Sequence, residues 1–280
     1  MAARMLRKAS PYTRRGARWA KRIALHPRYT ATVGRTLLQH PRLVVLAARK
    51  GSRPALLAEC DRLYPGPRGS FSSYEAGFWG QVFLFDEYEV SSLDLGHRPL
   101  VVDVGANVGF FSWRVAASHP GARVVAFEPQ GENFDRLRQL FEDVGIEGET
   151  VDAACGDHEG SATLYLRNSF THTVEPSMHP DMDSGSDSVK MVTLDGHMAG
   201  RRWGEPVALM KIDVEGAEVQ VLRGAGETLS RTANVVLEYH SDQSLRECSA
   251  ILTASGFTCR PKRYWGGAPG EGLLLCRRMA

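Results

Sequence analysis

Short apolar runs recur between residues 99 and 239, and each is followed by glycine or acidic residues. The runs predict strands that begin near residues 99, 122, 149, 207 and 233, and helix-like segments follow near 108, 131, 217 and 242. Strands that alternate with helices in this way are typical of a doubly wound parallel sheet. Near the end of the chain, a glycine-rich stretch between FTCRP and LLLCRR predicts a terminal hairpin that reverses one strand.

A turn containing Gly105, Asn107 and Gly109 follows the first of these strands, in the sequence PLVVDVGANVG (99–109). Glycine permits a positive φ and lets the backbone approach a ligand, and the start of the next helix offers unpaired N–H groups. These features predict a site for a nucleoside cofactor. The second strand ends in Glu128, about 20 residues beyond the turn, where such folds place a carboxylate on ribose hydroxyls.

Charge is divided unevenly along the 280 residues, although the net charge is only +2. Residues 1–58 carry 14 Lys or Arg and no Asp or Glu, and their apolar residues predict short amphipathic helices broken at Pro27 and Pro41. We therefore expect a basic helical extension over residues 1–70, ending in the linker YPGPRGSFSS, and a cofactor domain over residues 71–280. Two roles are open for the extension. It is either a cap whose arginines pair with the acidic remainder of the chain or with a second subunit, or a surface that binds an anionic partner.

Cysteine usage and hydropathy indicate the compartment. The five cysteines are scattered without a CxxC spacing, which predicts reduced thiols. No apolar run approaches the ~20 residues that a membrane span needs, and the N-terminus lacks the apolar region of a secretory signal. We expect a cytoplasmic protein, with peripheral contact to a membrane through the basic extension as an alternative.

Four blocks in order, DVGANVGFFS, FEP, LDG (194–196) and KIDVEGAEVQVLRGA, resemble the FkbM family of S-adenosylmethionine-dependent methyltransferases. The resemblance covers residues from about 100 to 260. It implies a class I methyltransferase (Rossmann-like) α/β fold with a terminal antiparallel strand, S-adenosyl-L-methionine as cofactor, and methylation of a hydroxyl on a natural product, sugar or glycolipid. The residues expected to line the cofactor site are Asp103, Gly105, Asn107, Gly109, Glu128, Asp152 and Ala154.

Methyl transfer to a hydroxyl requires an aligned acceptor and a group that takes its proton. Asp213 and His240 follow the fourth and fifth predicted strands, so both point to the crevice outside the carboxyl ends of the sheet. His172 lies in a long polar segment where substrate would enter, and His179 lies on the same segment. The candidate catalytic residues are Asp213, His240 and His172, and the expected partners of Asp213 are Lys211, Glu215 and Glu238.

Several alternatives stay open. No metal is expected, but a Mg²⁺ or Mn²⁺ ion that chelates a catechol or vicinal diol is the main mechanistic rival, with Asp213, Glu215, Glu238 and His240 as ligands. A nucleic-acid methyltransferase would explain the basic extension, but the chain has DVEG where an NPPY or DPPY tetrad is expected. A non-catalytic docking module is the third function class. Expected partners are a small-molecule, glycolipid or carrier-linked acceptor, an acidic carrier protein or anionic membrane, and a second copy of the chain.

Overall fold

The computed structural model describes residues 79–84, 86–166, 172–174, 186–199, 204–263 and 270–279. The basic extension and His179 lie outside the described residues, so the boundary near residue 70 stays a prediction. Of the described residues, those up to Glu87 belong to one compact unit, and those from Tyr88 onward belong to another. In the first unit, Trp79 is buried and stacks on Phe83 of the short helix η1 (Gly80–Leu84), with ring centroids 5.1 Å apart.

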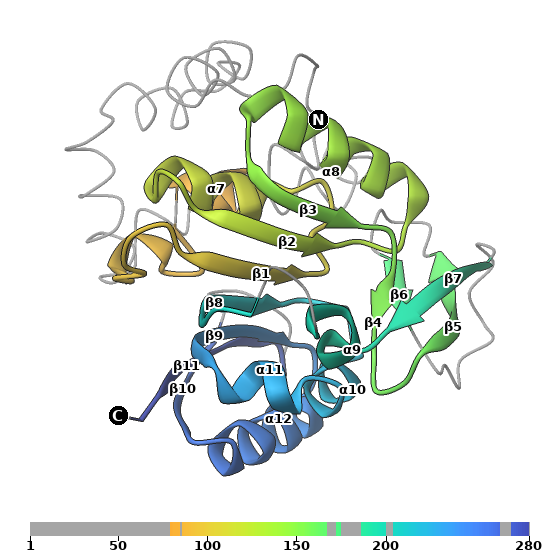
Figure 1. Ribbon diagram of the computed structural model, residues 1–280. Helices are drawn as coiled ribbons and strands as arrows, with labels where there is room; N and C mark the ends of the chain where they lie inside the picture. Colours follow the sequence, from red (N-terminus) through yellow and green to blue (C-terminus); the bar gives the residue numbers. More distant parts are fainter. Residues whose placement is uncertain are drawn as a thin grey trace, which may run out of the picture. The chain divides into compact units, whose positions relative to one another are not determined.

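A seven-stranded sheet organises the second unit, and its strand order is β10-β11-β9-β8-β1-β2-β3 (Figure 1). β1, β2, β3, β8 and β9 pair in parallel, while β11 is antiparallel to both of its neighbours. This arrangement confirms the expected class I methyltransferase fold with a reversed strand near the end of the chain. The strands are β1 (Leu100–Val104), β2 (Arg123–Phe127), β3 (Glu147–Val151), β8 (Val207–Ile212), β9 (Thr232–Tyr239), β10 (Phe257–Arg263) and β11 (Gly272–Arg278).

Helices follow the strands where the sequence pattern predicts them, and they form two groups beside the sheet (Figure 1). Side chains cap two of these helices: Gln130 accepts from Asn133 N at 2.6 Å, and Ser241 accepts from Ser244 N at 2.9 Å. Two short helices, α9 and α11, were not predicted. The helices are η2 (Val90–Ser92), α7 (Phe110–Ser118), α8 (Gly131–Val144), α9 (Leu194–Met198), α10 (Glu218–Arg223), α11 (Gly226–Ser230) and α12 (Asp242–Ala254).

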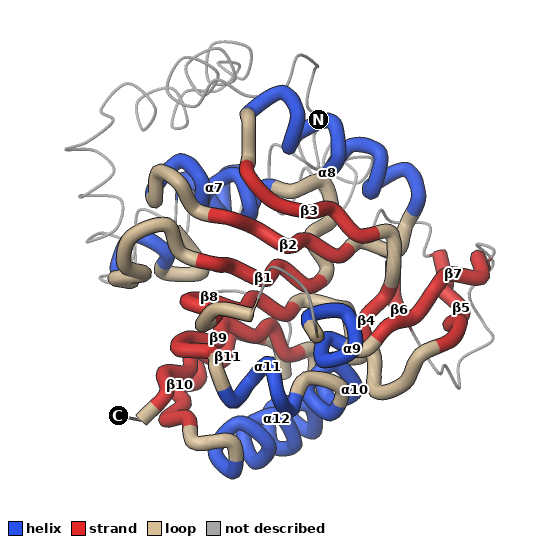
Figure 2. The backbone as a smooth tube through the Cα atoms, viewed as in Figure 1, coloured by secondary structure: helices blue, strands red, loops and turns tan. Residues whose placement is uncertain are grey.

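A second, four-stranded sheet in the order β4-β7-β5-β6 lies to one side of the large sheet, beyond α9 (Figure 2). The segment from 149 to 157, predicted as one strand, is split at Asp152: β3 ends at Val151 in the large sheet, and β4 begins at Ala154 in the small one. The strands of this sheet are β4 (Ala154–Cys155), β5 (Gly160–Leu166), β6 (His172–Val174) and β7 (Ser186–Val192).

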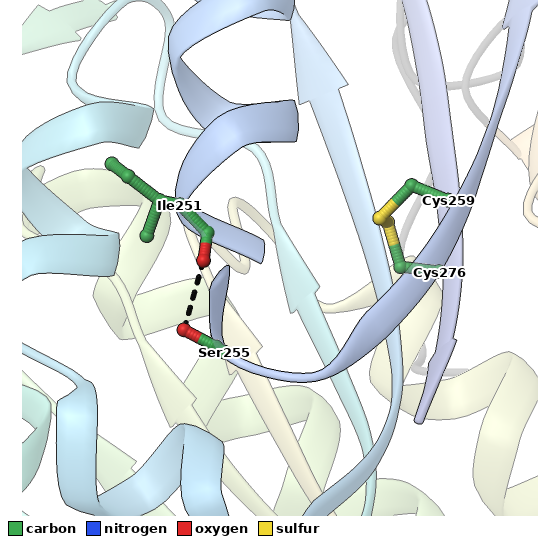
Figure 3. The surroundings of a disulfide bond; sticks show 4 residues. All are labelled: Ile251, Ser255, Cys259 and Cys276. Carbon is green, nitrogen blue, oxygen red and sulfur yellow. Dashed lines mark hydrogen bonds between the residues drawn. A yellow bond between two sulfur atoms is a disulfide. The ribbon is translucent and has the colours of Figure 1, made fainter. Parts of the chain in front are cut away.

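One expectation about the cysteines is wrong. Cys259 on β10 and Cys276 on β11 are directly opposite each other in the antiparallel pair, and a disulfide joins them (Figure 3). Cys155 and Cys248 are free and buried, as inert thiols would be. The sequence could not indicate the pair because the strand register, which brings the two Cα atoms within 4.1 Å, is not visible in the spacing of 17 residues.

No helix among the described residues is long and apolar enough to cross a membrane.

Candidate active site

The turn between β1 and α7 lies against the ends of β2 and β8. The backbone N–H groups of Gly105 and Ala106 both donate to the carbonyl of Phe127, at 3.0 and 2.9 Å. Gly105 has φ +75°, and a Cβ at this position would lie 1.8 Å from the carbonyl oxygen of Asp213. Only glycine fits here, because the end of β8 passes directly beside the turn.

Gly109 has the positive φ that the sequence pattern predicts, and packing adds a second reason for glycine. Its φ is +90°, and a Cβ would lie 2.5 Å from Leu140 Cδ2 and 2.8 Å from Leu137 Cδ1. Its small size therefore lets α7 approach the leucines of α8. Asn107, with φ 52°, uses its side-chain oxygen to accept from Val108 N at 2.8 Å. Contacts of Gly109 and Asn107 with a cofactor stay predictions.

Glu128 follows β2 and joins this turn to the next helix. Its Oε2 accepts from Asn107 N at 2.7 Å, and its Oε1 accepts from Gln130 N at 3.0 Å. Burial raises the pKa of Glu128 to about 7, and the two backbone hydrogen bonds and the charge of Lys211 limit that rise. A buried carboxylate is thus held beside the glycine turn, at the position where the sequence predicts a contact with ribose.

A buried ion-pair network lies beneath the turn. Lys211 of β8 donates to the carbonyl of Gly105 at 2.7 Å, and its Nζ is 3.4 Å from Asp103 Oδ1 and 3.3 Å from Asp213 Oδ2. Burial alone would lower the pKa of Lys211, but the carboxylates of Asp213, Asp103 and Glu238 outweigh burial and raise it. The other oxygen of Asp103 accepts from Ser112 at 2.6 Å. Lys211 therefore ties the glycine turn to the end of β8 as a permanent cation.

Asp213, Glu238 and His240 converge at the carboxyl ends of β8 and β9, and we call them the acid–histidine cluster. The parallel register pairs Ile212 with Leu237, so the residues that follow these two lie side by side. Each side chain of the acid–histidine cluster offers a ligand atom, and these atoms all lie within 4.8 Å of one another. The three side chains are 16–19% exposed, so a ligand from solvent can reach them.

Glu218, the first residue of α10, fixes the orientation of the ring of His240 through a hydrogen bond. The Nδ1 of His240 lies 2.8 Å from Glu218 Oε1, and Ser244 donates to Glu218 Oε2 at 3.0 Å. The Nε2 of His240 is 3.6 Å from Glu215 Oε2 and 3.8 Å from Glu238 Oε1. Burial lowers the pKa of His240, but the hydrogen bond to Glu218 and the carboxylates around the ring raise it to about 10.

The other predicted site residues follow or belong to strands other than β8 and β9. Asp152 is exposed in the connection after β3, and Ala154 is buried in β4. His172 lies on β6, an edge strand of the small sheet, whereas Asp213 and His240 follow strands of the large sheet. The roles of these residues stay predictions.

Sequence reasoning missed Glu218, Ser244 and Ser112, which orient the residues that it named. Glu218 stands between the apolar residues Ala217 and Val219 in the block KIDVEGAEVQVL, and it is fully buried. An acid on the apolar side of a predicted helix is a signal that could have found it, because a buried carboxylate needs partners. Asp195 of the LDG block has a structural role, since it accepts from the backbone of Glu227 and Thr228 at the start of α11.

Comparison with known proteins agrees with this arrangement. Residues 103–258 match the methyltransferase FkbM domain. Methyltransferase sdnD of Sordaria araneosa is 27% identical over 256 residues, covering 79% of this chain and 96% of the relative. The 31-O-demethyl-FK506 methyltransferase FkbM of Streptomyces tacrolimicus is 27% identical over 216 residues, covering 66% and 82%. Hexuronic acid methyltransferase AglP of Haloferax volcanii is 26% identical over 151 residues, covering 54% and 60%.

Among solved structures, an O-methyltransferase from Bacillus cereus in complex with SAH is 12% identical and aligns with a TM-score of 0.46, covering 88% of this chain and 100% of that one. The family match extends over more than half of the 280 residues and contains the glycine turn, Glu128 and the whole acid–histidine cluster. The chain therefore belongs to the FkbM family and is a methyltransferase that depends on S-adenosyl-L-methionine.

Proposed function

We propose that the protein transfers the methyl group of S-adenosyl-L-methionine to a hydroxyl of a small polyhydroxylated molecule, namely a natural product, a sugar or a glycolipid. The acid–histidine cluster beside the glycine turn carries this proposal, because a hydroxyl acceptor requires hydrogen-bond acceptors and a route for its proton. The names of two relatives support it, since one acts on demethylated FK506 at a 31-O position and another on a hexuronic acid.

For the cofactor, we propose that Gly105, Asn107 and Glu128 line its site and that Glu128 accepts hydrogen bonds from the ribose hydroxyls. A carboxylate with acceptor capacity left after two backbone N–H bonds suits a diol. Asp152 and Ala154 complete this proposed site after β3, and Asp103 and Gly109 support the turn from within the chain.

In the proposed reaction, the acceptor oxygen attacks the methyl carbon of the sulfonium. The O–CH₃ bond forms, the S–CH₃ bond breaks, and its electron pair returns to sulfur to give S-adenosylhomocysteine. The proton of the hydroxyl passes to Asp213 or His240, with His172 as the alternative from the small sheet. Asp213 is favoured over His240, because a pKa raised to about 10 leaves the ring of His240 already protonated near neutral pH. Glu218 supports a role for His240, because its hydrogen bond to Nδ1 directs Nε2 toward the acid–histidine cluster.

The test is an assay of cell extract with labelled cofactor, run with and without the purified protein. Mass spectrometry then identifies the methylated product. Asp213→Asn keeps the size of the side chain and removes its charge, so turnover should fall by about 10²- to 10⁴-fold while binding of S-adenosylhomocysteine changes little. His240→Ala is the matched variant for the alternative base. A product methylated on nitrogen or carbon, or unchanged turnover in both variants, contradicts the proposal.

The partners and location of the chain are also proposals. We propose that residues 1–58 cap the acidic remainder of the chain or a second copy, with an acidic carrier protein or an anionic membrane as the alternative partner. A cytoplasmic location is kept as a prediction, and the Cys259–Cys276 disulfide provides a test of it. Structural disulfides are rare in reducing compartments. Alkylation of the protein in freshly lysed cells shows whether Cys259 and Cys276 are free thiols, as a cytoplasmic location predicts, or joined in the disulfide.

A further inference from the structure

The acid–histidine cluster has the composition and spacing of a cation site. Asp213, Glu238 and His240 supply two carboxylate oxygens and one imidazole nitrogen, all within 4.8 Å of one another. Ligand atoms this close need only small side-chain rotations to reach one ion. Carboxylates suit Mg²⁺ and Mn²⁺, and an imidazole in the set favours Mn²⁺ over Mg²⁺. The three side chains come from two adjacent parallel strands, so the sheet itself holds their spacing.

The orientation of His240 is a second observation that points to a metal. A histidine that binds a metal usually donates its other ring N–H to a carboxylate, which fixes the tautomer and aims the free nitrogen. Glu218 provides this contact at 2.8 Å to Nδ1, and it lies behind the acid–histidine cluster with no exposed surface. The backbone N–H of Gly216 and the hydroxyl of Ser244 hold the same carboxylate in place. His240 Nε2 is thereby directed toward Glu238.

Charge around the ring also favours a dication. Three glutamates, Glu215, Glu218 and Glu238, lie within 3.8 Å of the nitrogens of His240. Asp213 follows the adjacent strand, and Lys211 contacts it on its buried side. These carboxylates favour positive charge at His240, and a divalent ion that displaces the proton of the ring would supply more of it.

We propose that Asp213, Glu238 and His240 bind a divalent cation of the Mn²⁺ or Mg²⁺ type, and that the open positions of the ion receive two neighbouring oxygens of the acceptor. The second half of this inference rests on the proposed function. The substrate class is then an acceptor with a vicinal diol or an adjacent hydroxyl and carbonyl. A bound ion would lower the pKa of the acceptor hydroxyl and stabilise its alkoxide. The hydroxyl proton would pass to solvent, and the alkoxide would take the methyl from sulfur, whose electron pair returns to give S-adenosylhomocysteine. In this case Asp213 and His240 act as ligands and not as the base.

Mn²⁺ binding to the full chain tests the site without any acceptor or turnover. Electron paramagnetic resonance and calorimetry, with S-adenosylhomocysteine present, should show one Mn²⁺ per chain, and Glu238→Gln and His240→Gln should lose it. Glu218→Gln should weaken Mn²⁺ binding by roughly 10- to 100-fold because the ring of His240 loses its charged partner. Glu142→Gln, an exposed acid on α8, is the control and should bind Mn²⁺ as the parent does. Binding of S-adenosylhomocysteine by each variant shows that it is folded.

A parent protein that binds no Mn²⁺, or binding that survives both Glu238→Gln and His240→Gln, overturns the cation site. Turnover that persists in EDTA also overturns it and leaves the proposed methyl transfer intact. Conversely, a protein that binds Mn²⁺ and methylates no hydroxyl contradicts the proposed function and leaves the site standing. Rates on matched acceptors with and without the neighbouring oxygen test the substrate class, and equal rates contradict it.

Discussion

Replacing Glu128 with Gln tests the proposed cofactor site most directly. Glu128 accepts the backbone N–H groups of Asn107 at 2.7 Å and Gln130 at 3.0 Å, and its remaining lone pairs are proposed to face the ribose diol. Gln keeps the size but turns one oxygen into a donor, so one backbone N–H loses its acceptor and the ribose loses a charged partner. Contacts of this kind contribute about 1.5–3 kcal/mol. Binding of S-adenosylhomocysteine should therefore weaken by roughly 10- to 100-fold.

The raised pKa of Glu128 makes the same contact dependent on pH. The pKa of Glu128 is about 7 in the folded protein, compared with an ordinary value of 4.5. The carboxyl is therefore mostly protonated at pH 6 and mostly ionised at pH 8. The ionised form accepts the ribose hydroxyls, so affinity should rise about 10-fold from pH 6 to pH 8. Without the cofactor, the contribution of Glu128 to the free energy of unfolding changes with pH in the opposite direction. A carboxyl whose pKa is raised on folding contributes less to stability as pH rises from 4.5 to about 7.

Calorimetric titration of the parent, Glu128→Gln and the exposed control Glu132→Gln at both pH values separates these effects. The control should match the parent, and Glu128→Gln should lose most of the pH dependence as well as the affinity. Equal affinity in the parent and Glu128→Gln, or a parent whose affinity is flat between pH 6 and pH 8, would refute the assignment of Glu128 to the cofactor.

Three further outcomes follow from the structure. Gly105→Ala places a Cβ 1.8 Å from the Asp213 carbonyl, so the free energy of unfolding should fall by about 3 kcal/mol or more, and an unchanged denaturant midpoint would contradict this geometry. Replacing Cys259 and Cys276 with Ser removes a cross-link worth about 3 kcal/mol and should lower Tm by roughly 6 to 12 °C; a reductant should do the same to the parent and nothing to the variant. Deleting residues 1–58 should destabilise or precipitate the protein if they are a cap. A stable truncation that loses only a salt-sensitive rate on a membrane-bound or carrier-linked acceptor would indicate the anionic partner.

Local sequence patterns determined much of the large sheet and the family of this protein. Apolar runs predicted β1, β2, β8 and β9, because a strand buried on both faces must be apolar nearly throughout. The predicted strand near 149 corresponds to β3, which lies at the edge of the sheet and is only partly buried. The glycine turn, Glu128 and the block KIDVEGAEVQVL identified the methyltransferase family, since a turn with a positive φ and a carboxylate at a strand end leave a mark within a few residues. These features depend on neighbours in sequence, so the sequence alone was sufficient to predict them.

Only the tertiary structure decided which distant residues meet. The sequence predicted that Asp213, Glu238 and His240 lie near the same crevice, but their spacing depends on the register of β8 and β9. The disulfide depends on the register of β10 and β11. The close contact of Gly109 with Leu137 and Leu140 likewise depends on how α8 packs. The buried hydrogen bonds of Glu218 likewise join α10, the end of β9 and α12. Register and packing are set by the summed fit of whole strands and helices, and no short stretch of sequence records that fit.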